Sequence, residues 1–274
     1  MEIKILVENA TYRKGILAEH GLSVYIEAAG KKILFDAGQT GALMQNAAAM
    51  GVDLAEVELA VLSHGHYDHS GGFPAFAALN KNAPIYLRKE ALGEFHSMKR
   101  DGSPGGYVGI SWSPEERSAL ASRLEFAEGV ASLGEGLFLF NVPGGAEAGG
   151  STESFLEREA GGGFRTDPLL HEQFLAIEED GQLFLFSGCS HTGAAPMLRR
   201  AGELFPGKKI RFLLAGLHLV RSSRQEAEQM AALLAAMELT VAPLHCTGME
   251  AACLLKERLG ERCLLLHAGD VLSF

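Results

Sequence analysis

Three histidines and one aspartate lie within six consecutive positions, and this cluster restricts what the chain can fold into more than any other feature. The residues are His64, His66, Asp68 and His69, in the spacing HxHxDH. Imidazole suits zinc, iron and related divalent metals, and a carboxylate can complete the ligand shell. His64 and His66, two positions apart, can point to one metal, whereas Asp68 and His69 can point to a second. The spacing therefore predicts a site for divalent metal ions.

The residues on either side predict where this cluster lies in the fold. Val57–Leu62 (VELAVL) is typical of a short buried strand, and Gly71 and Gly72 after the cluster let the backbone turn tightly. A loop that leaves the end of a rigid strand holds its side chains in place and still admits substrate. The alternative is a polar turn with accidental histidines. The clustering disfavours it, because the whole chain has only 10 histidines in 274 residues.

Two other apolar runs also end in residues that can bind metal. Gln182–Ser187 (QLFLFS) leads to Cys189 and His191, and Thr240–Leu244 leads to His245. A thiolate is a strong zinc ligand, but a buried free cysteine is also common as a small apolar side chain. Both roles stay open for Cys189, whereas we expect His191 to bind metal.

Two further polar residues stand at predicted strand ends. His218 follows the apolar run Lys209–Ala215, and we expect it to contact substrate, with a packed structural histidine as the alternative. Asp36 follows the predicted strand Lys32–Phe35. A carboxylate there can orient a metal-bound histidine, or it can cap a helix or turn.

Two stretches, 96–113 and 143–164, lack clear periodicity. Long irregular stretches in a compact domain are usually functional or disordered. We expect both to be loops over the active-site face, with solvated surface insertions as the alternative. His171, just before a predicted strand, is expected to be a surface histidine rather than a ligand. The candidate substrate contacts in the first stretch are His96, Lys99, Arg100, Tyr107 and Trp112.

Composition limits the class of protein and its partners. At 274 residues, one large α/β domain spanning 1–274 is expected. The net charge of −10 argues against nucleic acid as the main partner. The four cysteines show no disulfide-scaffold spacing, and neither a signal peptide nor a membrane span is visible. We therefore expect a cytoplasmic protein with reduced thiols that acts on a small molecule, with its oligomeric state left open.

Several segments together carry a resemblance to a known family. They are AEHGLSVYIE (Ala18–Glu27), ILFDAG (Ile33–Gly38), LSHGHYDHSGG around the histidine cluster, SGCSHTG (Ser187–Gly193), GLHL (Gly216–Leu219) and PLHCTG (Pro243–Gly248). The chain resembles the metallo-β-lactamase superfamily, whose signature is HxHxDH after an apolar strand. Its segments look like one branch, the metal-dependent hydrolases related to the dihydropterin–ribofuranosylaminobenzene phosphate synthase of methanopterin biosynthesis.

The resemblance implies a fold and a ligand set. The fold is a four-layer αββα sandwich, two mixed β-sheets flanked by helices. Many members place a bridging aspartate at the position that looks equivalent to Cys189, so the coordination at this position stays open. Two zinc ions are the default, with manganese or iron as alternatives. The first metal would take His64, His66 and His191, and the second Asp68, His69 and His245, with Cys189 near both.

The implied function is a metal-dependent hydrolase that acts on a small phosphorylated or ester substrate through a metal-activated water. His218 or Asp68 would move the proton to the leaving group. The branch extends this expectation to a pterin-pathway synthase-like activity. The alternatives are a metal-bound sensor of a small ligand and a diiron redox enzyme, although no flavin-binding domain is visible. A nuclease is disfavoured by the acidic balance.

Overall fold

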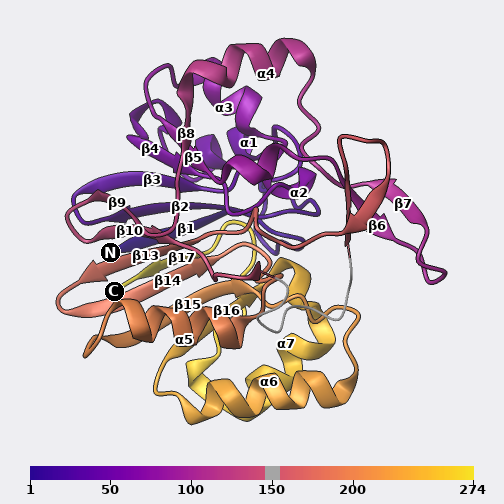
Figure 1. The fold of residues 1–274 in the computed structure, drawn as a ribbon. Helices are drawn as coiled ribbons and strands as arrows, with labels where there is room; N and C mark the ends of the chain where they lie inside the picture. The colour runs from indigo at the N-terminus through magenta and orange to yellow at the C-terminus, as the bar shows by residue number, and fades with distance from the viewer. Residues whose placement is uncertain (146–154) are drawn as a thin grey trace.

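Two β-sheets pack face to face at the centre of the molecule, and helices cover the outer face of each (Figure 1). The structure is a computed structural model that describes residues 1–145 and 155–274. Its layers run helix, sheet, sheet, helix, so the predicted αββα sandwich is confirmed. Within the described ranges, no helix is long and apolar enough to cross a membrane.

The first sheet has the strand order β17-β1-β2-β3-β4-β5-β8. Strands β17, β1, β2 and β3 pair antiparallel, and β3, β4, β5 and β8 pair parallel. The strands are β1 (Glu2–Val7), β2 (Ser23–Ala28), β3 (Lys31–Phe35), β4 (Leu59–Val61), β5 (Ile85–Leu87), β8 (Leu124–Phe126) and β17 (Val271–Ser273).

The second sheet has the strand order β16-β15-β14-β13-β10-β9. Its strands β14, β15 and β16 run parallel, so their carboxyl ends meet at one edge. The strands are β9 (Ala131–Gly134), β10 (Leu137–Phe140), β13 (Phe174–Glu179), β14 (Gln182–Ser187), β15 (Lys209–Gly216) and β16 (Thr240–Leu244).

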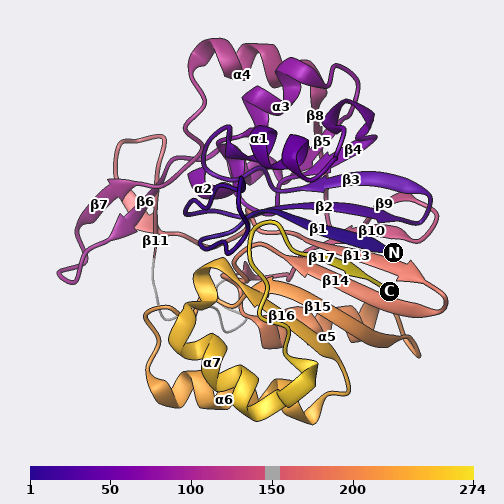
Figure 2. The same ribbon diagram turned by 180° about the vertical axis from the view of Figure 1, so that it is seen from behind.

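The helices divide between the two outer faces, as the front and back views show (Figures 1 and 2). Over the first sheet lie α1 (Ala42–Ala49), α3 (Phe73–Leu79) and α4 (Pro114–Leu120), and over the second lie α5 (Ala194–Leu204), α6 (Arg224–Ala236) and α7 (Met249–Leu259). The single turn α2 (Tyr67–Ser70) carries part of the histidine cluster. Short 3₁₀ turns span Leu54–Glu56, Lys89–Leu92, Ala121–Arg123, His245–Thr247 and Gly260–Arg262.

The strand β3 shows how sequence alternation builds the layers. Successive side chains of a strand point to opposite faces of the sheet. Phe35 therefore packs between the sheets, near Phe186 and Phe212, whereas Leu34 packs toward the helices, near Phe73. All five side chains are fully buried. Burying each contributes about 1.5–3 kcal/mol relative to exposure, and this packing fixes the strand ends that carry the polar residues.

A third, smaller sheet corrects the expectation that 96–113 and 143–164 are irregular loops. Its order is β12-β11-β6-β7, and it lies to one side of the sandwich (Figure 1). Alternation was hard to recognise because β7 reads PGGY and β12 has only three residues. Positions 146–154 of the second stretch lie outside the described residues. The strands are β6 (Phe95–Met98), β7 (Pro104–Tyr107), β11 (Phe155–Arg158) and β12 (Phe164–Thr166).

Candidate metal centre

The polar residues predicted at strand ends come together where the carboxyl ends of strands from both sheets meet. Strand β4 leads to the histidine cluster, β14 to Cys189 and His191, and β16 to His245. All seven predicted ligands are less than a tenth exposed. They are His64, His66, Asp68, His69, Cys189, His191 and His245. Burying so many polar side chains is costly unless they are paired or bind a metal.

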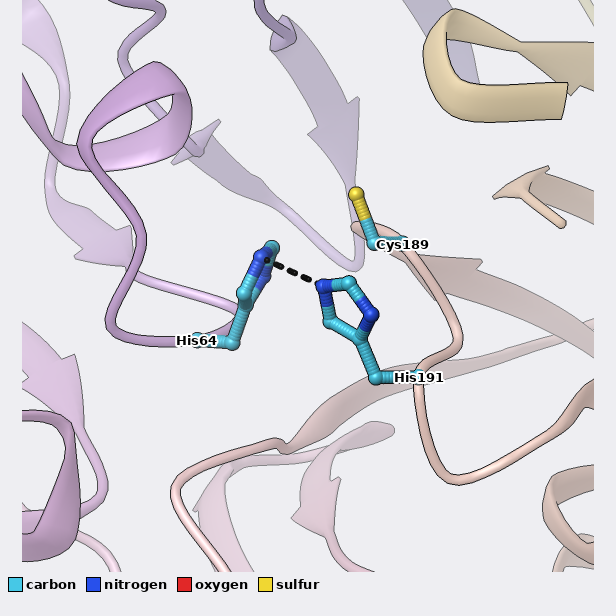
Figure 3. Close-up of side chains that lie close together, drawn as sticks. All are labelled: His64, Cys189 and His191. Atoms are coloured by element: carbon cyan, nitrogen blue, oxygen red, sulfur yellow. Dashed lines mark hydrogen bonds between the residues drawn. The ribbon is translucent and has the colours of Figure 1, made fainter. Parts of the chain in front are cut away.

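A first group contains His64, Cys189 and His191, which face one another in Figure 3. Nε2 of His64 lies 3.3 Å from Nε2 of His191. The ligand atoms of the three residues all lie within 4.8 Å of one another. Two imidazole nitrogens and one thiol sulfur are a donor set that zinc accepts.

A second group contains His69, Cys189 and His245. Nε2 of His69 lies 3.3 Å from Nε2 of His245 and 3.2 Å from the sulfur of Cys189. The carboxylate of Asp68 joins this group, since its Oδ2 lies 3.2 Å from His245 Nε2. Cys189 therefore belongs to both groups, and its role as a ligand stays a prediction.

His66 lies beside the first group in a different arrangement. Its ring centroid is 4.6 Å from that of His64 and 4.8 Å from that of His191. His66 forms a group with Asp167 and His171, and the ligand atoms of these three residues all lie within 4.8 Å of one another. The rings of His64, His66 and His191, the predicted ligands of the first metal, thus lie in contact with one another. The group whose ligand atoms all lie within 4.8 Å of one another, however, consists of His64, Cys189 and His191.

Hydrogen bonds accepted by the Asp36 carboxylate set the ring orientations of two histidines, one directly and one through Ser63. Asp36 accepts a hydrogen bond from His69 Nδ1 at 2.7 Å and two from Ser63, through its amide and its hydroxyl, also at 2.7 Å. The Ser63 hydroxyl has only one proton, so its oxygen must accept from His64 Nδ1, 2.8 Å away. With Nδ1 carrying the proton in each ring, the neutral form of both imidazoles presents Nε2 as the lone pair that binds metal.

A similar arrangement holds His245 from the N-terminal strand. Its Nδ1 lies 2.8 Å from Oδ1 of Asn9, an oxygen that can only accept, so Nδ1 carries the proton. The backbone amide of His245 donates to the Glu8 carboxylate at 2.9 Å. The neutral form of His245 with the proton on Nδ1 therefore also presents Nε2 to a metal. Neither Asn9 nor Glu8 was predicted, because they are more than 230 residues away in sequence.

Burial keeps most of these imidazoles neutral. Burial, with neighbouring histidines, holds the pKa values of His64 and His191 well below the usual range. Burial also lowers the pKa of His66 to about 3. Neutral imidazole is the form that ligates metals.

His69 has the opposite balance. Burial alone would lower its pKa, but the carboxylates of Asp36 and Asp68 raise it to about 9. A metal cation at Nε2 would take the place of this proton and satisfy the same carboxylates.

One buried ring nitrogen tests whether the site fits a metal. Within the described residues, Nε2 of His66 has no hydrogen-bond partner. An unsatisfied buried polar group costs about 1–3 kcal/mol. With three further imidazoles whose neutral forms present Nε2 beside a thiol and a carboxylate, the residues fit a divalent cation.

His171 is buried rather than at the surface, so that expectation was wrong. It is only 1% exposed. Its Nε2 lies 2.9 Å from the Asp167 carboxylate, and its Nδ1 accepts the backbone amide of Gly65 at 3.0 Å. The adjacent Glu172 accepts hydrogen bonds from the amides of His191 and Thr192 at 2.7 and 2.8 Å. The pair His171 and Glu172, just before β13, therefore holds both the loop of the HxHxDH cluster and the loop that carries His191.

His20 was also missed by sequence reasoning. Its Nε2 lies 3.1 Å from Oδ2 of Asp68, and its ring centroid is 4.8 Å from that of His245. Its side chain is 54% exposed, in contrast to the buried histidines around it. His20 therefore stands where the second group opens to solvent. Its position within the segment Ala18–Glu27 was the available signal.

His218 lies at the solvent side of the first group. It is half-buried, and its ring centroid is 4.4 Å from that of His191. His218 has a backbone φ of 49°, and Asp36, Ser190 and His245 also adopt the left-handed conformation. Such residues cost about 1–3 kcal/mol each and cluster at functional sites. Here Asp36 and His245 directly follow strands, Ser190 follows Cys189, and His218 lies two residues after β15.

The candidate substrate contacts of 96–113 differ in burial and in what they contact. Trp112 is buried at 5% exposure and donates to the Ser70 carbonyl at 2.7 Å, so it supports the histidine loop instead of facing substrate. His96 packs between the rings of Tyr107 and Phe164 on the third sheet. Lys99 and Arg100 are exposed. From the third sheet, it is Phe155 that reaches the centre, 4.8 Å from the His66 ring.

Comparison with known proteins identifies the family. The model of the metallo-β-lactamase superfamily matches residues 17–247. In Methanocaldococcus jannaschii, the uncharacterized protein MJ0448 is 29% identical over 251 residues, 91% of each chain. The 7,8-dihydropterin-6-methyl-4-(β-D-ribofuranosyl)-aminobenzene-5′-phosphate synthase of that organism is 26% identical over 302 residues, 100% of this chain and 97% of the synthase.

A solved structure agrees with this assignment. The crystal structure of Tm1679, described as a metal-dependent hydrolase of the β-lactamase superfamily, matches with a TM-score of 0.84 at 29% identity. The match covers 100% of this chain and 99% of Tm1679. On the family model and this shared fold, the chain belongs to the metallo-β-lactamase superfamily.

Proposed function

We propose that this protein is a metal-dependent hydrolase that acts on a small phosphorylated or ester substrate. The observation that supports it most is the convergence of buried donors from both sheets, with Nδ1 of three imidazoles held by hydrogen bonds so that their neutral forms present Nε2 to a metal. The proposed first metal takes His64, His66 and His191. The proposed second metal takes Asp68, His69 and His245, and Cys189 is shared by both.

The donor set favours zinc, with manganese or iron as the alternatives. A thiolate ligand at Cys189 would strengthen the preference for zinc over manganese, which prefers oxygen ligands. A bound divalent metal would lower the pKa of water toward neutrality and polarise a phosphoryl or carbonyl oxygen.

The chain's own residues position these ligands and move the proton. Asp36 holds His69 and, through Ser63, His64, so that two rings keep their orientation during turnover. His218, half-buried beside the first group, is the proposed proton donor to the leaving atom. Asp68, which contacts the half-exposed His20, is the second candidate for this proton transfer.

A cavity of about 640 Å³ is lined by residues that follow two of the site histidines in sequence: Leu219 comes directly after His218, and Thr247 lies two residues after His245. Arg224 lines it but is paired with Glu228 at 2.8 Å, and Glu250 and Glu257 line it as well, so its charge does not favour a phosphate group. The name of the 26% identical synthase includes a 5′-phosphate, which supports a phosphorylated substrate and a related pterin chemistry for this chain.

The test is turnover of a substrate panel by the metal-loaded and the chelated protein. The panel contains phosphomonoesters, phosphodiesters, carboxylic esters and lactones. We expect hydrolysis of at least one class, lost on chelation and restored by zinc. His69→Ala should lose most of this activity, whereas His96→Ala, a histidine of the third sheet, should retain it.

Two outcomes would contradict the proposal. Binding of a panel compound without turnover would favour the sensor, and bound iron with a reversible redox transition but no hydrolysis would favour the redox enzyme.

A further inference from the structure

We propose that Cys189, His218 and Cys246 form a third metal site, rich in sulfur, which takes a thiophilic cation such as Cu⁺ or Cd²⁺. The ligand atoms of these three residues lie within 4.8 Å of one another. This site goes beyond the proposed hydrolase function, since Cys246 is not among the ligands of either hydrolytic metal. It shares only Cys189 with them.

The donor chemistry separates this site from the two histidine groups. Two thiols and one imidazole are soft donors, and soft thiolate ligands select Cu⁺ and zinc-group cations over magnesium, calcium or manganese. Each histidine group instead offers at most one sulfur. A thiophilic cation would therefore prefer this site, because among the groups found in residues 1–145 and 155–274 it alone has two sulfur atoms.

The backbone is built to bring the two thiols together. A Cβ atom at Gly216 would lie 2.6 Å from the sulfur of Cys246 and 3.2 Å from Cα of Cys189. The Gly216 amide donates to the Gly188 carbonyl at 2.8 Å, so β15 ends in close contact with the Cys189 loop. Glycine at 216 thus leaves the space in which the thiol of Cys246 lies.

The loop that carries His218 is tied to the loop that carries Cys246. The Leu217 amide donates to the Thr247 hydroxyl at 3.0 Å, and the Val220 amide donates to the Cys246 carbonyl at 3.1 Å. These bonds lie on both sides of His218. The backbone that carries His218 is therefore fixed beside the loop that carries Cys246.

Both thiols of the proposed site are buried. Cys189 is 3% exposed and Cys246 is 6% exposed. Cys253, in contrast, is exposed on α7 and offers a matched control for adventitious binding of metal to a surface thiol. Substitution of Cys246 therefore tests the site, and substitution of Cys253 tests the background binding of metal to a surface thiol.

The experiment is a Cd²⁺ titration of the metal-free protein, followed through the ultraviolet thiolate-to-cadmium absorption band. We expect Cys246→Ser to reduce the band of the first equivalent to about half and to weaken its binding at least ten-fold, about 1.4 kcal/mol. Cys253→Ser should titrate like the parent. A Cys246→Ser protein with the parent's band and affinity would overturn the proposal.

Two further measurements keep the outcome clear. X-ray absorption of the parent protein with one Cd²⁺ bound should give two sulfur neighbours, and a single sulfur would overturn the proposal without any substitution. Zinc in the histidine groups is a separate readout. If His64→Ala loses zinc but keeps the two-sulfur cadmium signal, this site is supported independently of the histidine groups. If the parent binds zinc but gives no two-sulfur cadmium signal, this site is ruled out and the hydrolase proposal is unaffected.

Discussion

The imidazole Nδ1 of His171 accepts a hydrogen bond from the backbone amide of Gly65 at 3.0 Å, although 106 residues separate the two in sequence. Gly65 lies between the first two histidines of the HxHxDH cluster. The other ring nitrogen of His171 is fixed by Asp167 at 2.9 Å. The orientation of the cluster therefore depends on a segment from the other half of the chain.

The first prediction concerns this contact. Replacing His171 with Gln should weaken zinc binding by about 10- to 100-fold, the usual cost of losing a group that orients metal ligands. Competition with a chromophoric chelator measures the affinity. His267→Gln is the control, because His267 also faces an aspartate, Asp270, at 3.7 Å, but near the C-terminus. Equal zinc affinities for both variants would argue against a positioning role of His171.

Glu172 provides the second prediction. Its carboxylate accepts the amides of His191 and Thr192 and the hydroxyl of Thr192. Glu172→Gln turns one acceptor oxygen into a donor that faces these groups, so we expect a loss of about 1–3 kcal/mol in unfolding free energy. Chemical denaturation measures it, with the partly exposed Glu179→Gln as the control. An unchanged midpoint for Glu172→Gln would show that this hydrogen-bond set is dispensable.

Gly71 provides the third prediction and corrects the reason for its presence. Its φ of −64° and ψ of −27° are helical, so no special turn requires glycine. Instead, a Cβ atom would lie 1.9 Å from the Gln39 carbonyl oxygen. Gly71→Ala should therefore lower stability by about 1–3 kcal/mol. Gly106→Ala, where no atom lies within 4 Å of the added Cβ, should have a melting temperature close to that of the parent.

The fourth prediction concerns Cys189, which stands between the two histidine groups. If it ligates a metal, chelation will sharply increase its alkylation by a thiol reagent while the fold persists. Mass spectrometry of the labelled peptides separates Cys189 from Cys246. Equal labelling of Cys189 in metal-free and metal-loaded protein would remove it from the proposed ligands. Cys189→Asp should bind two metals at least as well as the parent.

The main sandwich was predictable because its strands are apolar and end in recognisable polar residues. The strands Gln182–Ser187 and Thr240–Leu244 have their predicted bounds, and the run Val57–Leu62 contains the shorter β4. The third sheet was not predictable. Its strand β7 is rich in glycine, and β6 pairs with the distant β11, where Ser97 lies opposite Phe155.

The donors at the centre were predictable from local spacing, but the residues that orient them were not. Asn9, Glu172 and His171 act through contacts with distant segments, which no local pattern encodes. The local signal for His171 and Glu172 was that polar residues directly precede the apolar strand β13, whose own packing does not require them. Asp36 was predictable because it directly follows a strand, and its hydrogen bond to His69 is the contact expected of an orienting carboxylate.

The metal content of the purified protein tests the central claim most directly. Elemental analysis of the parent, of His66→Ala and of His96→Ala should be made side by side after loading with zinc and removal of the excess. We predict two equivalents in the parent and in His96→Ala, and the loss of most of one equivalent in His66→Ala. Unchanged zinc content in His66→Ala, or a parent that retains no metal, would contradict the account.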